Sequence, residues 1–364
     1  MKKNGKETPR KEFPGKLLRW NKEENDRQMP WKGEKDPYKI WLSEIILQQT
    51  RVEQGLKYYN NFVRTFPTIR QLAKAPDEKV FKLWEGLGYY SRCRNLIATA
   101  RYIAEERKGV FPDTYDEIKS LKGIGPYTAA AISSFAFNLP HAVVDGNVFR
   151  VLARIFGIDK PIDSTEGKKY FSELANELLD KKQPGLYNQA IMDFGAVICK
   201  PANPLCQTCG FKNDCVAFLQ NRINELPVKE KKTGMRKRWF FYFVIGYKDQ
   251  VAIRQRMAKD IWQQLYEFPM IESDKEHDIQ KMISAAEKAD WLQKKKYDTI
   301  SLSPVFKQQL SHQMIAARFI AVKLHNKPVS ANDWQWITAK NFTKHAFPQV
   351  INQYLRKTKE QNLF

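Results

Sequence analysis

The sequence predicts two domains of different fold class, a helical domain over residues 1–222 and an α+β domain over residues 238–364. Before residue 222, apolar residues recur at helical spacing, whereas after residue 238 they fall in short alternating runs rich in aromatic and β-branched side chains. Residues 223–237 between them are charged, contain Pro and Gly and lack an apolar face, so we interpret them as a basic linker. At 364 residues, the chain is long enough for two or three domains with cores of their own.

Composition indicates a folded protein with a polyanionic partner. The chain is 43% hydrophobic and 13% aromatic, which is typical of globular domains. Its formal net charge is +21 and both predicted domains are basic, which favours DNA or RNA as a partner. The N-terminus lacks the apolar stretch of a signal peptide, and no run of about eighteen apolar residues occurs. We therefore expect a protein that is not secreted, does not enter a membrane and works in the cytoplasm.

The helical domain contains a carboxylate in an apolar setting. In "DPYKIWLSEIILQQT", Asp36 suits a helix N-cap and Pro37 the first turn. Glu44 has apolar neighbours on every side of this helix, so burial should raise the pKa of its carboxyl and let it carry a proton. The alternative is an ordinary Glu at the edge of an amphipathic face.

Residues 115–137, "YDEIKSLKGIGPYTAAAISSFAF", contain two helical stretches joined at "LKGIG". Gly123 and Gly125 permit a tight turn with positive φ, and Pro126 suits the start of the second helix. The backbone N–H groups of such a turn could bind a DNA phosphate. An ordinary connection between two helices is the alternative.

A second candidate carboxylate follows in "LPHAVVDGNVFRVLARIFG". Asp145 precedes Asn147 at the start of a predicted helix, where Asp is a preferred N-cap. We expect the helix N-terminus to keep the pKa of Asp145 low. One protonated and one ionised carboxyl form the arrangement that cleaves glycosidic bonds, because one donates a proton and the other stabilises the sugar cation.

Four of the five cysteines lie in residues 199–215, with the spacing C-x6-C-x2-C-x5-C. Such crowding favours a metal site in which the chain wraps around one centre, and either a structural zinc or a [4Fe–4S] cluster fits this spacing. Four unrelated buried thiols are the third possibility. The predicted ligands are Cys199, Cys206, Cys209 and Cys215. Cys93 stands alone and is interpreted as an ordinary packed thiol.

The second domain shows strand-like runs at "RWFFYFVIGYKD", "QVAIRQR" and "AARFIAVKL". The residues "KDQ" between the first two runs predict a hairpin turn. A helix is expected over residues 276–293. The combination predicts an α+β domain.

Together, the "LKGIGPYTA" hairpin (about 115–135), the "VVDGNV" aspartate and the cysteine loop resemble the helix-hairpin-helix DNA glycosylase superfamily. The stretch "MPWKGEKDPYKIWLSEIILQQTRV" is similar to the MutY-type adenine glycosylases within it, and the resemblance covers residues 20–220. It implies that the four cysteines hold a [4Fe–4S] cluster rather than zinc.

The resemblance also implies roles for the site residues. Glu44 would protonate adenine, and Asp145 would stabilise the sugar cation, with support from Tyr127 and Asn147. Relatives of the endonuclease III type place a Lys where this chain has Tyr127, and a phenol cannot form a Schiff base with the sugar. The resemblance therefore implies a monofunctional glycosylase without strong lyase activity.

A further implied set of residues contacts the flipped base and the DNA. Arg27, Trp31 and Gln189 match the adenine pocket, Tyr89 matches a side chain inserted into the base stack, and Gln49 and Thr50 lie beside the opposite base. Without the resemblance, core packing would be the preferred role of Trp31 and Tyr89.

Residues 238–364 resemble the Nudix-like C-terminal domain of these enzymes, which reads 8-oxoguanine opposite the adenine. Glu267 and Glu272 are present, but the R-E-x-x-E-E helix of a Nudix hydrolase is not, which argues against pyrophosphatase activity. Ser311 and His312 match a family F-S-H motif in which Leu310 replaces Phe.

The resemblance thus implies an adenine DNA glycosylase that acts on double-stranded DNA carrying A·8-oxoguanine or A·G mispairs. Because the sequence shows no obvious oligomerisation stripe, we expect a monomer. The alternatives are a sister glycosylase acting on thymine or uracil in G mismatches, a non-catalytic cluster-bearing DNA-binding protein, and a zinc-stabilised nucleic-acid-binding protein. Retention of both Glu44 and Asp145 argues against the non-catalytic cluster-bearing protein, since phosphate binding needs neither carboxylate. The colour of the purified protein would test the zinc alternative, because an iron–sulfur cluster is brown and zinc thiolates are colourless.

Overall fold

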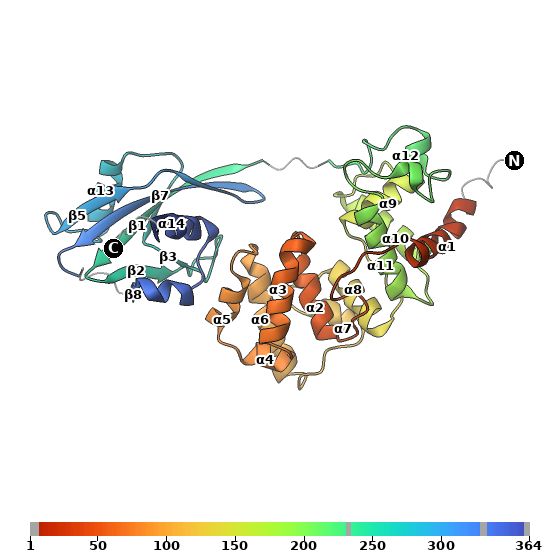
Figure 1. The fold of residues 1–364 in the computed structure, drawn as a ribbon, viewed down its shortest axis with the longest axis horizontal. Helices are drawn as coiled ribbons and strands as arrows, with labels where there is room; N and C mark the ends of the chain where they lie inside the picture. The colour runs from red at the N-terminus through yellow and green to blue at the C-terminus, as the bar shows by residue number, and fades with distance from the viewer. Residues whose placement is uncertain (1–6, 231–233, 328–332, 360–364) are drawn as a thin grey trace. The chain divides into compact units, whose positions relative to one another are not determined.

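A computed structural model of the chain describes residues 7–230, 234–327 and 333–359. The chain divides into two compact units (Figure 1). The first comprises Met1–Lys74 with Ala98–Lys232, and the second comprises Ala75–Ile97 with Thr233–Phe364. No helix in the described part of the chain is long and apolar enough to cross a membrane.

The first unit is helical, as the sequence predicts, and its first helix already begins at Glu7. Its elements are α1 (Glu7–Glu23), α2 (Pro37–Leu47), α3 (Val52–Thr65), α4 (Ile69–Lys74), the end of α6 (Tyr90–Glu105), α7 (Tyr115–Ser120), α8 (Pro126–Phe137), α9 (Gly146–Phe156), α10 (Thr165–Leu178), α11 (Pro184–Val197), η1 (Cys206–Thr208) and α12 (Val216–Leu219).

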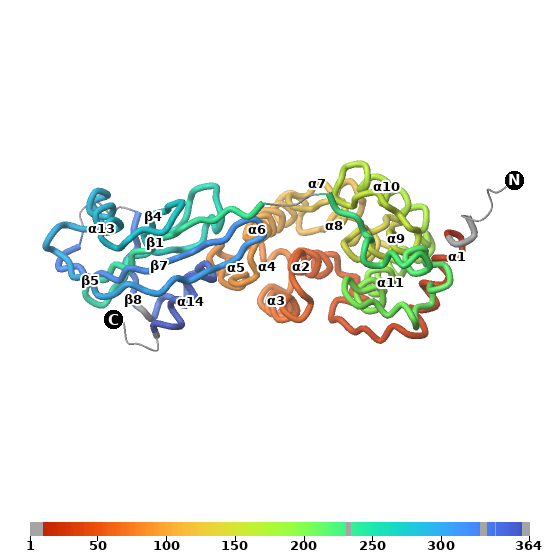
Figure 2. The backbone as a smooth tube through the Cα atoms, turned by 90° about the horizontal axis from the view of Figure 1, so that it is seen from above, coloured from red at the N-terminus to blue at the C-terminus, as the bar shows by residue number. Residues whose placement is uncertain are grey.

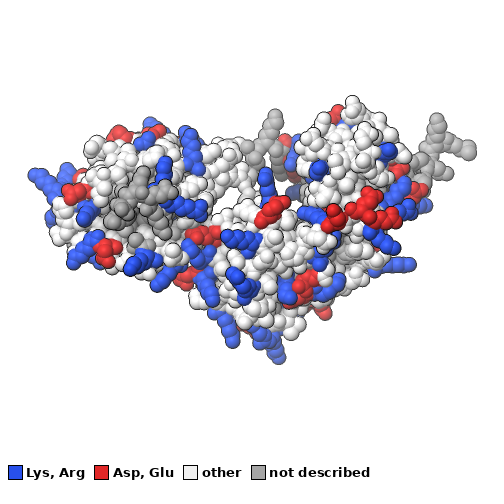
Figure 3. Space-filling model, viewed as in Figure 1, with Lys and Arg blue, Asp and Glu red and all other residues white. Residues whose placement is uncertain are grey.

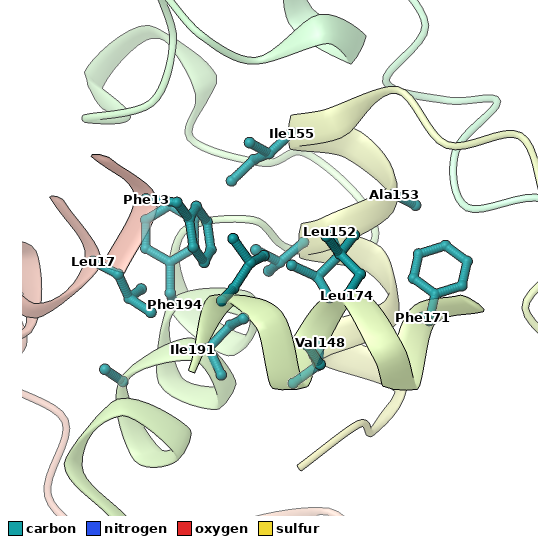
Figure 4. Packing of buried hydrophobic residues seen from close by; sticks show 14 of the residues in the cluster. Phe13, Leu17, Val148, Leu152, Ala153, Ile155, Phe171, Leu174, Ile191 and Phe194 are labelled. Atoms are coloured by element: carbon teal, nitrogen blue, oxygen red, sulfur yellow. The ribbon is translucent and has the colours of Figure 1, made fainter. Parts of the chain in front are cut away.

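Helix α9 lies at the centre of the core of this unit (Figure 4). One of its faces carries Val148, Leu152 and Ile155, all buried against apolar residues from α1, α10 and α11. Figure 2 shows α9, α10 and α11 side by side in the view from above. Because three helices pack on α9, the position of its N-terminus is fixed by the core.

Two predicted helix starts are confirmed. Asp36 is the N-cap of α2 and accepts a hydrogen bond from the backbone N–H of Tyr38, and Pro37 occupies the first turn. The hairpin at residues 115–137 consists of α7 and α8, and Pro126 begins α8.

The two hairpin glycines differ in conformation. Gly123 has φ +81°, in the left-handed region, as predicted. The prediction was wrong for Gly125, which has φ −94° and forms the extended N-cap of α8. A Cβ atom built on Gly125 meets nothing within 4 Å, so this glycine leaves the exposed backbone open rather than permitting a turn.

The second unit is an α+β fold around one mixed sheet. Helix α5 (Asp77–Trp84) and the start of α6 belong to it, with α13 (Ile279–Lys288), η2 (Ala339–Lys344) and α14 (Gln349–Lys359). The strands are β1 (Arg236–Tyr247), β2 (Gln250–Gln255), β3 (Tyr266–Glu267), β4 (Met270–Ser273), β5 (Tyr297–Leu302), β6 (Phe306–Gln309), β7 (Gln313–Leu324) and β8 (Gln335–Thr338).

The long strands β1 and β7 form the parallel centre of the sheet, and the remaining pairs are antiparallel. Tyr247 pairs with Gln250 across a two-residue turn, which confirms the predicted hairpin between β1 and β2. The strand begins at Arg236, so the last two residues of the predicted linker belong to the sheet.

Strand β1 is buried on both faces of the sheet. Trp239, Phe241 and Phe243 pack in a cluster that includes residues of α13, while Tyr242 stacks on Phe319 of β7 with ring centroids 5.2 Å apart. Phe319 in turn stacks on Tyr354 of α14. The predicted helix over residues 276–293 is shorter than expected, because α13 ends at Lys288.

Candidate active site and cysteine loop

A cavity of about 330 Å³ in the first unit brings together the predicted catalytic and adenine-pocket residues, with Gln49 and Thr50. The end of α2, the starts of α8 and α9, one face of α11 and the segment before α2 all contribute to its lining. The predicted residues at this cavity are Arg27, Trp31, Glu44, Gln49, Thr50, Tyr127, Asp145, Asn147 and Gln189. Met29, Gln48 and Met192, which the sequence did not single out, also line it.

Glu44 is buried, with 8% of its surface exposed, as its apolar sequence context predicts. Burial raises the pKa of its carboxyl to about 7, and the nearby Asp145 charge adds to that rise. A hydrogen bond from the Tyr127 hydroxyl acts in the opposite direction. Glu44 can therefore hold a proton near neutral pH.

Asp145 caps α9, as predicted, and also faces the cavity. One carboxylate oxygen accepts from the backbone N–H groups of Asn147 and Val148, both at 2.8 Å, and the other accepts from Asn147 Nδ2 at 2.7 Å. The expected low pKa is not found, because burial raises the pKa of Asp145 above its usual value. The three N–H donors oppose that rise by stabilising the ionised form.

Arg150 connects the Asp145 site to the cysteine loop. Its guanidinium donates to Asn147 Oδ1 at 2.9 Å, to the Gly195 carbonyl at 2.7 Å and to the Cys199 carbonyl at 2.7 Å. The bond to Asn147 fixes which end of that amide faces Asp145. Sequence reasoning missed Arg150 because an Arg within a helix is usually a solvated residue.

Helices α9 and α11 approach closely beside this network. A Cβ atom on Gly195 of α11 would lie 2.6 Å from Cβ of Asn147 and 3.2 Å from its Cα. Only a glycine at this position allows Asn147 to reach its place beside Asp145.

Helix α11 also carries a carboxylate that the sequence analysis missed and that bonds two of the cavity-lining side chains. Asp193 is fully buried and accepts a hydrogen bond from Arg27 Nη1 at 2.7 Å and one from Gln189 Nε2 at 3.0 Å. Trp31 is 9% exposed and packs edge-on against Tyr59. It is therefore part of the hydrophobic core and also lines the cavity.

The four clustered cysteines line one small pocket of the first unit. Apolar side chains of α9, α11 and the following loop form the rest of its wall. Arg154 of α9 donates to the carbonyls of Lys200 and Pro201 and lies 3.7 Å from Cys199 Sγ. The loop is therefore held to α9 by a buried cation. The thiols at the pocket belong to Cys199, Cys206, Cys209 and Cys215.

In number and kind, these thiols fit the ligands of an iron–sulfur cluster. Within the described residues, no group of three or more His, Cys, Asp or Glu side chains is arranged to hold a metal ion. Burial raises the pKa of Cys209 to about 12, so metal binding at this loop would have to displace protons. Cys93 is buried elsewhere, as an ordinary packed thiol should be.

The remaining predicted residues lie away from the cavity. Gly123 and Gly125 are at the exposed hairpin. In the second unit, a cavity of about 570 Å³ is lined by Tyr89, Leu310, Ser311 and His312 among others. The Tyr89 hydroxyl hydrogen-bonds Ser311 Oγ at the tip of the β6–β7 hairpin.

Gln49 and Tyr89, both predicted to contact DNA bases, share an unusual backbone conformation. Gln49 has φ +55° and Tyr89 has φ +48°, in the left-handed region of backbone conformation that residues other than glycine rarely adopt. Such conformations cluster at functional sites, because the surrounding structure must enforce them.

The two acidic residues considered for a Nudix metal site are engaged by arginines. Glu267 pairs with Arg254 and Arg256, and Glu272 pairs with the buried Arg238. These carboxylates are thus committed to ion pairs within the sheet.

Two family models match the chain. The HhH-GPD superfamily of base excision DNA repair proteins matches residues 42–179, and the NUDIX domain matches residues 241–357. The adenine DNA glycosylase of Buchnera aphidicola subsp. Baizongia pistaciae is 33% identical over 355 residues, which is 95% of this chain and 96% of that protein. The chain belongs to the adenine DNA glycosylase family. The predicted enzyme class, a DNA glycosylase of base excision repair, is thereby confirmed.

Two further comparisons describe the reach of the adenine DNA glycosylase family resemblance. The human adenine DNA glycosylase is 42% identical over 214 residues, which is 56% of this chain and 39% of that protein. The solved structure of a thermostable thymine-DNA glycosylase has a TM-score of 0.54 and 31% identity, covering 58% of this chain and 97% of that one. A related fold therefore also occurs in an enzyme named for thymine.

The close contact of α9 and α11 predicts a large effect of one added methyl group. Gly195→Ala should lower the free energy of unfolding by about 1–3 kcal/mol, because its Cβ must displace Asn147. Gly15→Ala is the matched control. Its Cβ meets nothing within 4 Å in the exposed part of α1, so stability should rise by up to about 1 kcal/mol. Thermal and urea unfolding measure both, and equal stability of the two variants would contradict the contact.

Proposed function

We propose that this protein flips adenine, mispaired with 8-oxoguanine or guanine, out of duplex DNA into the 330 Å³ cavity and hydrolyses its N-glycosidic bond. One observation carries the proposal. Two carboxyls, the buried Glu44 and the half-buried Asp145, face the same cavity with different hydrogen-bond environments. Such a pair divides acid and anion roles between two residues.

Glu44 is the proton donor in this mechanism. With a pKa of about 7, its carboxyl is protonated in a large fraction of molecules at neutral pH. Proton transfer to a ring nitrogen makes adenine a neutral leaving group as the bond to the sugar C1′ breaks. The resulting carboxylate can then accept a proton from the water that attacks C1′, so proton and electron pair are both accounted for.

Asp145 stabilises the cationic sugar that forms as the bond breaks. Three N–H donors hold this carboxylate in place and favour its ionised form against the effect of burial, and Asn147 supplies two of the three. Tyr127 positions Glu44 through its hydroxyl and offers no amine for a Schiff base. The proposed enzyme therefore leaves an abasic site and has no strong lyase activity.

The proposed substrate is double-stranded DNA, which backbone N–H groups and basic side chains bind. In this proposal, the protein acts as a monomer on the chromosome in the cytoplasm. The exposed turn at Gly123 and Gly125 precedes the N-terminus of α8, where backbone N–H groups suit a phosphate. Gln49 and Thr50 line the cavity, and we assign the contact with the opposite base to them. Lys and Arg side chains are spread over both units on the face in Figure 3, which favours polyanion binding.

The second unit supplies the reader of 8-oxoguanine in this proposal. Tyr89, Ser311 and His312 line one cavity. In this proposal, Tyr89 enters the base stack, and the hydroxyl of Ser311 and the imidazole of His312 contact the lesion. Leu310 occupies the place of the family Phe, so this enzyme reads the lesion without that ring.

We further propose that Cys199, Cys206, Cys209 and Cys215 hold a [4Fe–4S] cluster. Bound there, the cluster would cross-link and orient a loop of the DNA-binding unit. Two observations support this role. The four cysteines line one pocket within the first unit, and Arg154 holds the loop to α9 by donating a hydrogen bond to the Lys200 carbonyl.

Substrate choice tests the proposed activity directly. Single-turnover base release is measured on matched duplexes carrying A opposite 8-oxoguanine, A opposite T, and T opposite G, each developed with and without alkali. We expect alkali-dependent breaks confined to A opposite 8-oxoguanine. Breaks at the T·G duplex would support the sister glycosylase, and breaks without alkali would disprove the monofunctional assignment.

The role of Glu44 predicts a specific pH dependence. The excision rate constant should fall about tenfold per pH unit above pH 7, because the donor loses its proton there. Glu44→Gln should retain mismatch binding but lose excision by roughly 10²–10⁴-fold. Glu177→Gln, at an exposed ion pair on α10, is the control and should change neither. An unaltered rate in Glu44→Gln excludes Glu44 as the donor.

The cluster assignment predicts a brown protein whose colour depends on the cysteine loop. Cys206→Ser should lose iron and visible absorption, and should weaken duplex binding, because the loop loses its cross-link. Cys93→Ala changes a packed thiol and should keep both. Iron, sulfide and zinc analysis of the purified variants decides the case, and a colourless zinc-containing wild type would refute the iron assignment.

A further inference from the structure

Asp193 is a buried carboxylate that the mechanism above does not use. It lies on α11 with none of its side chain exposed. One oxygen, Oδ1, accepts from Arg27 Nη1 at 2.7 Å and from Gln189 Nε2 at 3.0 Å. The other, Oδ2, accepts from Asn25 Nδ2 at 3.0 Å and lies 3.2 Å from Lys32 Nζ.

The number of donors, four, matches the roughly four lone-pair sites that a carboxylate offers. Arg27 and Lys32 carry positive charge and lie in the irregular segment before α2, as Asn25 does. The fourth donor, Gln189, lies one turn earlier on α11. A buried carboxylate needs such partners, because its desolvation would otherwise be too costly. Asp193 therefore anchors one wall of the base cavity.

The contact with Gln189 has a consequence for recognition. A carboxylate only accepts hydrogen bonds, so the Gln189 amide must turn its NH₂ group toward Asp193. Its carbonyl oxygen is then directed away from Asp193. Since Gln189 lines the cavity, this oxygen becomes an acceptor available to a bound base.

We propose that Asp193 is a positioning residue that sets the enzyme's preference for a 6-amino purine by fixing the Gln189 amide. This inference rests on the proposed adenine excision and adds the source of its selectivity. The exocyclic amine of adenine donates to the Gln189 oxygen, whereas a 6-oxo purine presents an acceptor there and leaves two acceptors facing each other. A site built for a substrate N–H discriminates strongly against an analogue that lacks it.

The same carboxylate aligns Arg27, which shares Oδ1 with Gln189. Loss of Asp193 would therefore release two cavity side chains together. The Oδ2 partners, Asn25 and Lys32, hold the wall without touching the Gln189 amide. Of the two Asp193 oxygens, only Oδ1 contacts the Gln189 amide. The Oδ2 partners instead bond the backbone of Arg27, whose N–H donates to Asn25 Oδ1 at 3.2 Å and whose carbonyl accepts from Lys32 Nζ at 2.9 Å.

The test compares base release from duplexes carrying adenine or hypoxanthine opposite 8-oxoguanine, under single turnover with full-length protein. Asp193→Asn can donate to the Gln189 oxygen and allow the amide to reverse. We expect the adenine-to-hypoxanthine rate ratio to fall at least about tenfold. Asn25→Ala removes an Oδ2 donor, so it should slow both reactions but keep the ratio. A merely structural role of Asp193 predicts equal losses on both bases, and that result would overturn the proposal.

Gln189→Leu provides a second test that does not require Asp193→Asn to fold. It should lower the ratio by itself, and adding Asp193→Asn to it should change the ratio no further. An unchanged ratio in Gln189→Leu contradicts the proposal. Failure of the wild type to release adenine opposite 8-oxoguanine would instead refute the proposed function, so the two failures are distinguishable.

Discussion

The hydrogen bonds from the first turn of α9 to Asp145 are the interaction on which the active-site end of the first unit depends. They end an extended loop, start the helix and hold a carboxylate at the cavity in a single arrangement. The same helix buries its apolar face in the core and uses Arg150 and Arg154 to hold the cysteine loop. The packing of α9 in the core, the attachment of the cysteine loop and the position of the Asp145 carboxylate consequently depend on the same helix.

Three carboxyls at or beside the cavity, the buried Glu44 and Asp193 and the half-buried Asp145, differ in the number of hydrogen-bond donors that contact them. Glu44 receives a hydrogen bond from one phenol, Asp145 receives three from N–H groups, and Asp193 has four donors, two of them cationic. Each added donor favours the charged form and restricts movement of the group. Under the proposed mechanism, this grading matches the proton donor, the group that stabilises the sugar cation, and an anchor beside the cavity, respectively.

Much of this arrangement could be predicted from local sequence, because helix caps and apolar periodicity are short-range signals. Asp36 and Asp145 were identifiable as caps, and the burial of Glu44 followed from its apolar neighbours. Asp193 carries the same signal, since "IMDFGAV" is an apolar helical stretch with one carboxylate, yet it went unnoticed. The pKa of Asp145 could not be predicted, because burial depends on the tertiary structure and outweighed the helix cap.

Long-range pairings were beyond sequence reasoning for the same reason. Nothing in the sequence around Arg150 indicates that it would meet Asn147 and two backbone carbonyls of α11 and the cysteine loop. The absence of positive φ at Gly125 likewise reflects the way the hairpin joins α8. Glycine permits that conformation but does not require it.

The division of the second unit between two distant stretches of chain affects how it is made. Residues 75–97 leave the ribosome long before their partners. Glu85 bonds Phe347 across 262 residues, and Lys82 bonds the His345 carbonyl across 263. Contacts at such separations form slowly, because a long loop must close before they contribute stability. Residues 75–97 are therefore synthesised well before the residues that they contact in the native structure. We expect the second unit to fold last and to be the part most prone to misfolding during synthesis.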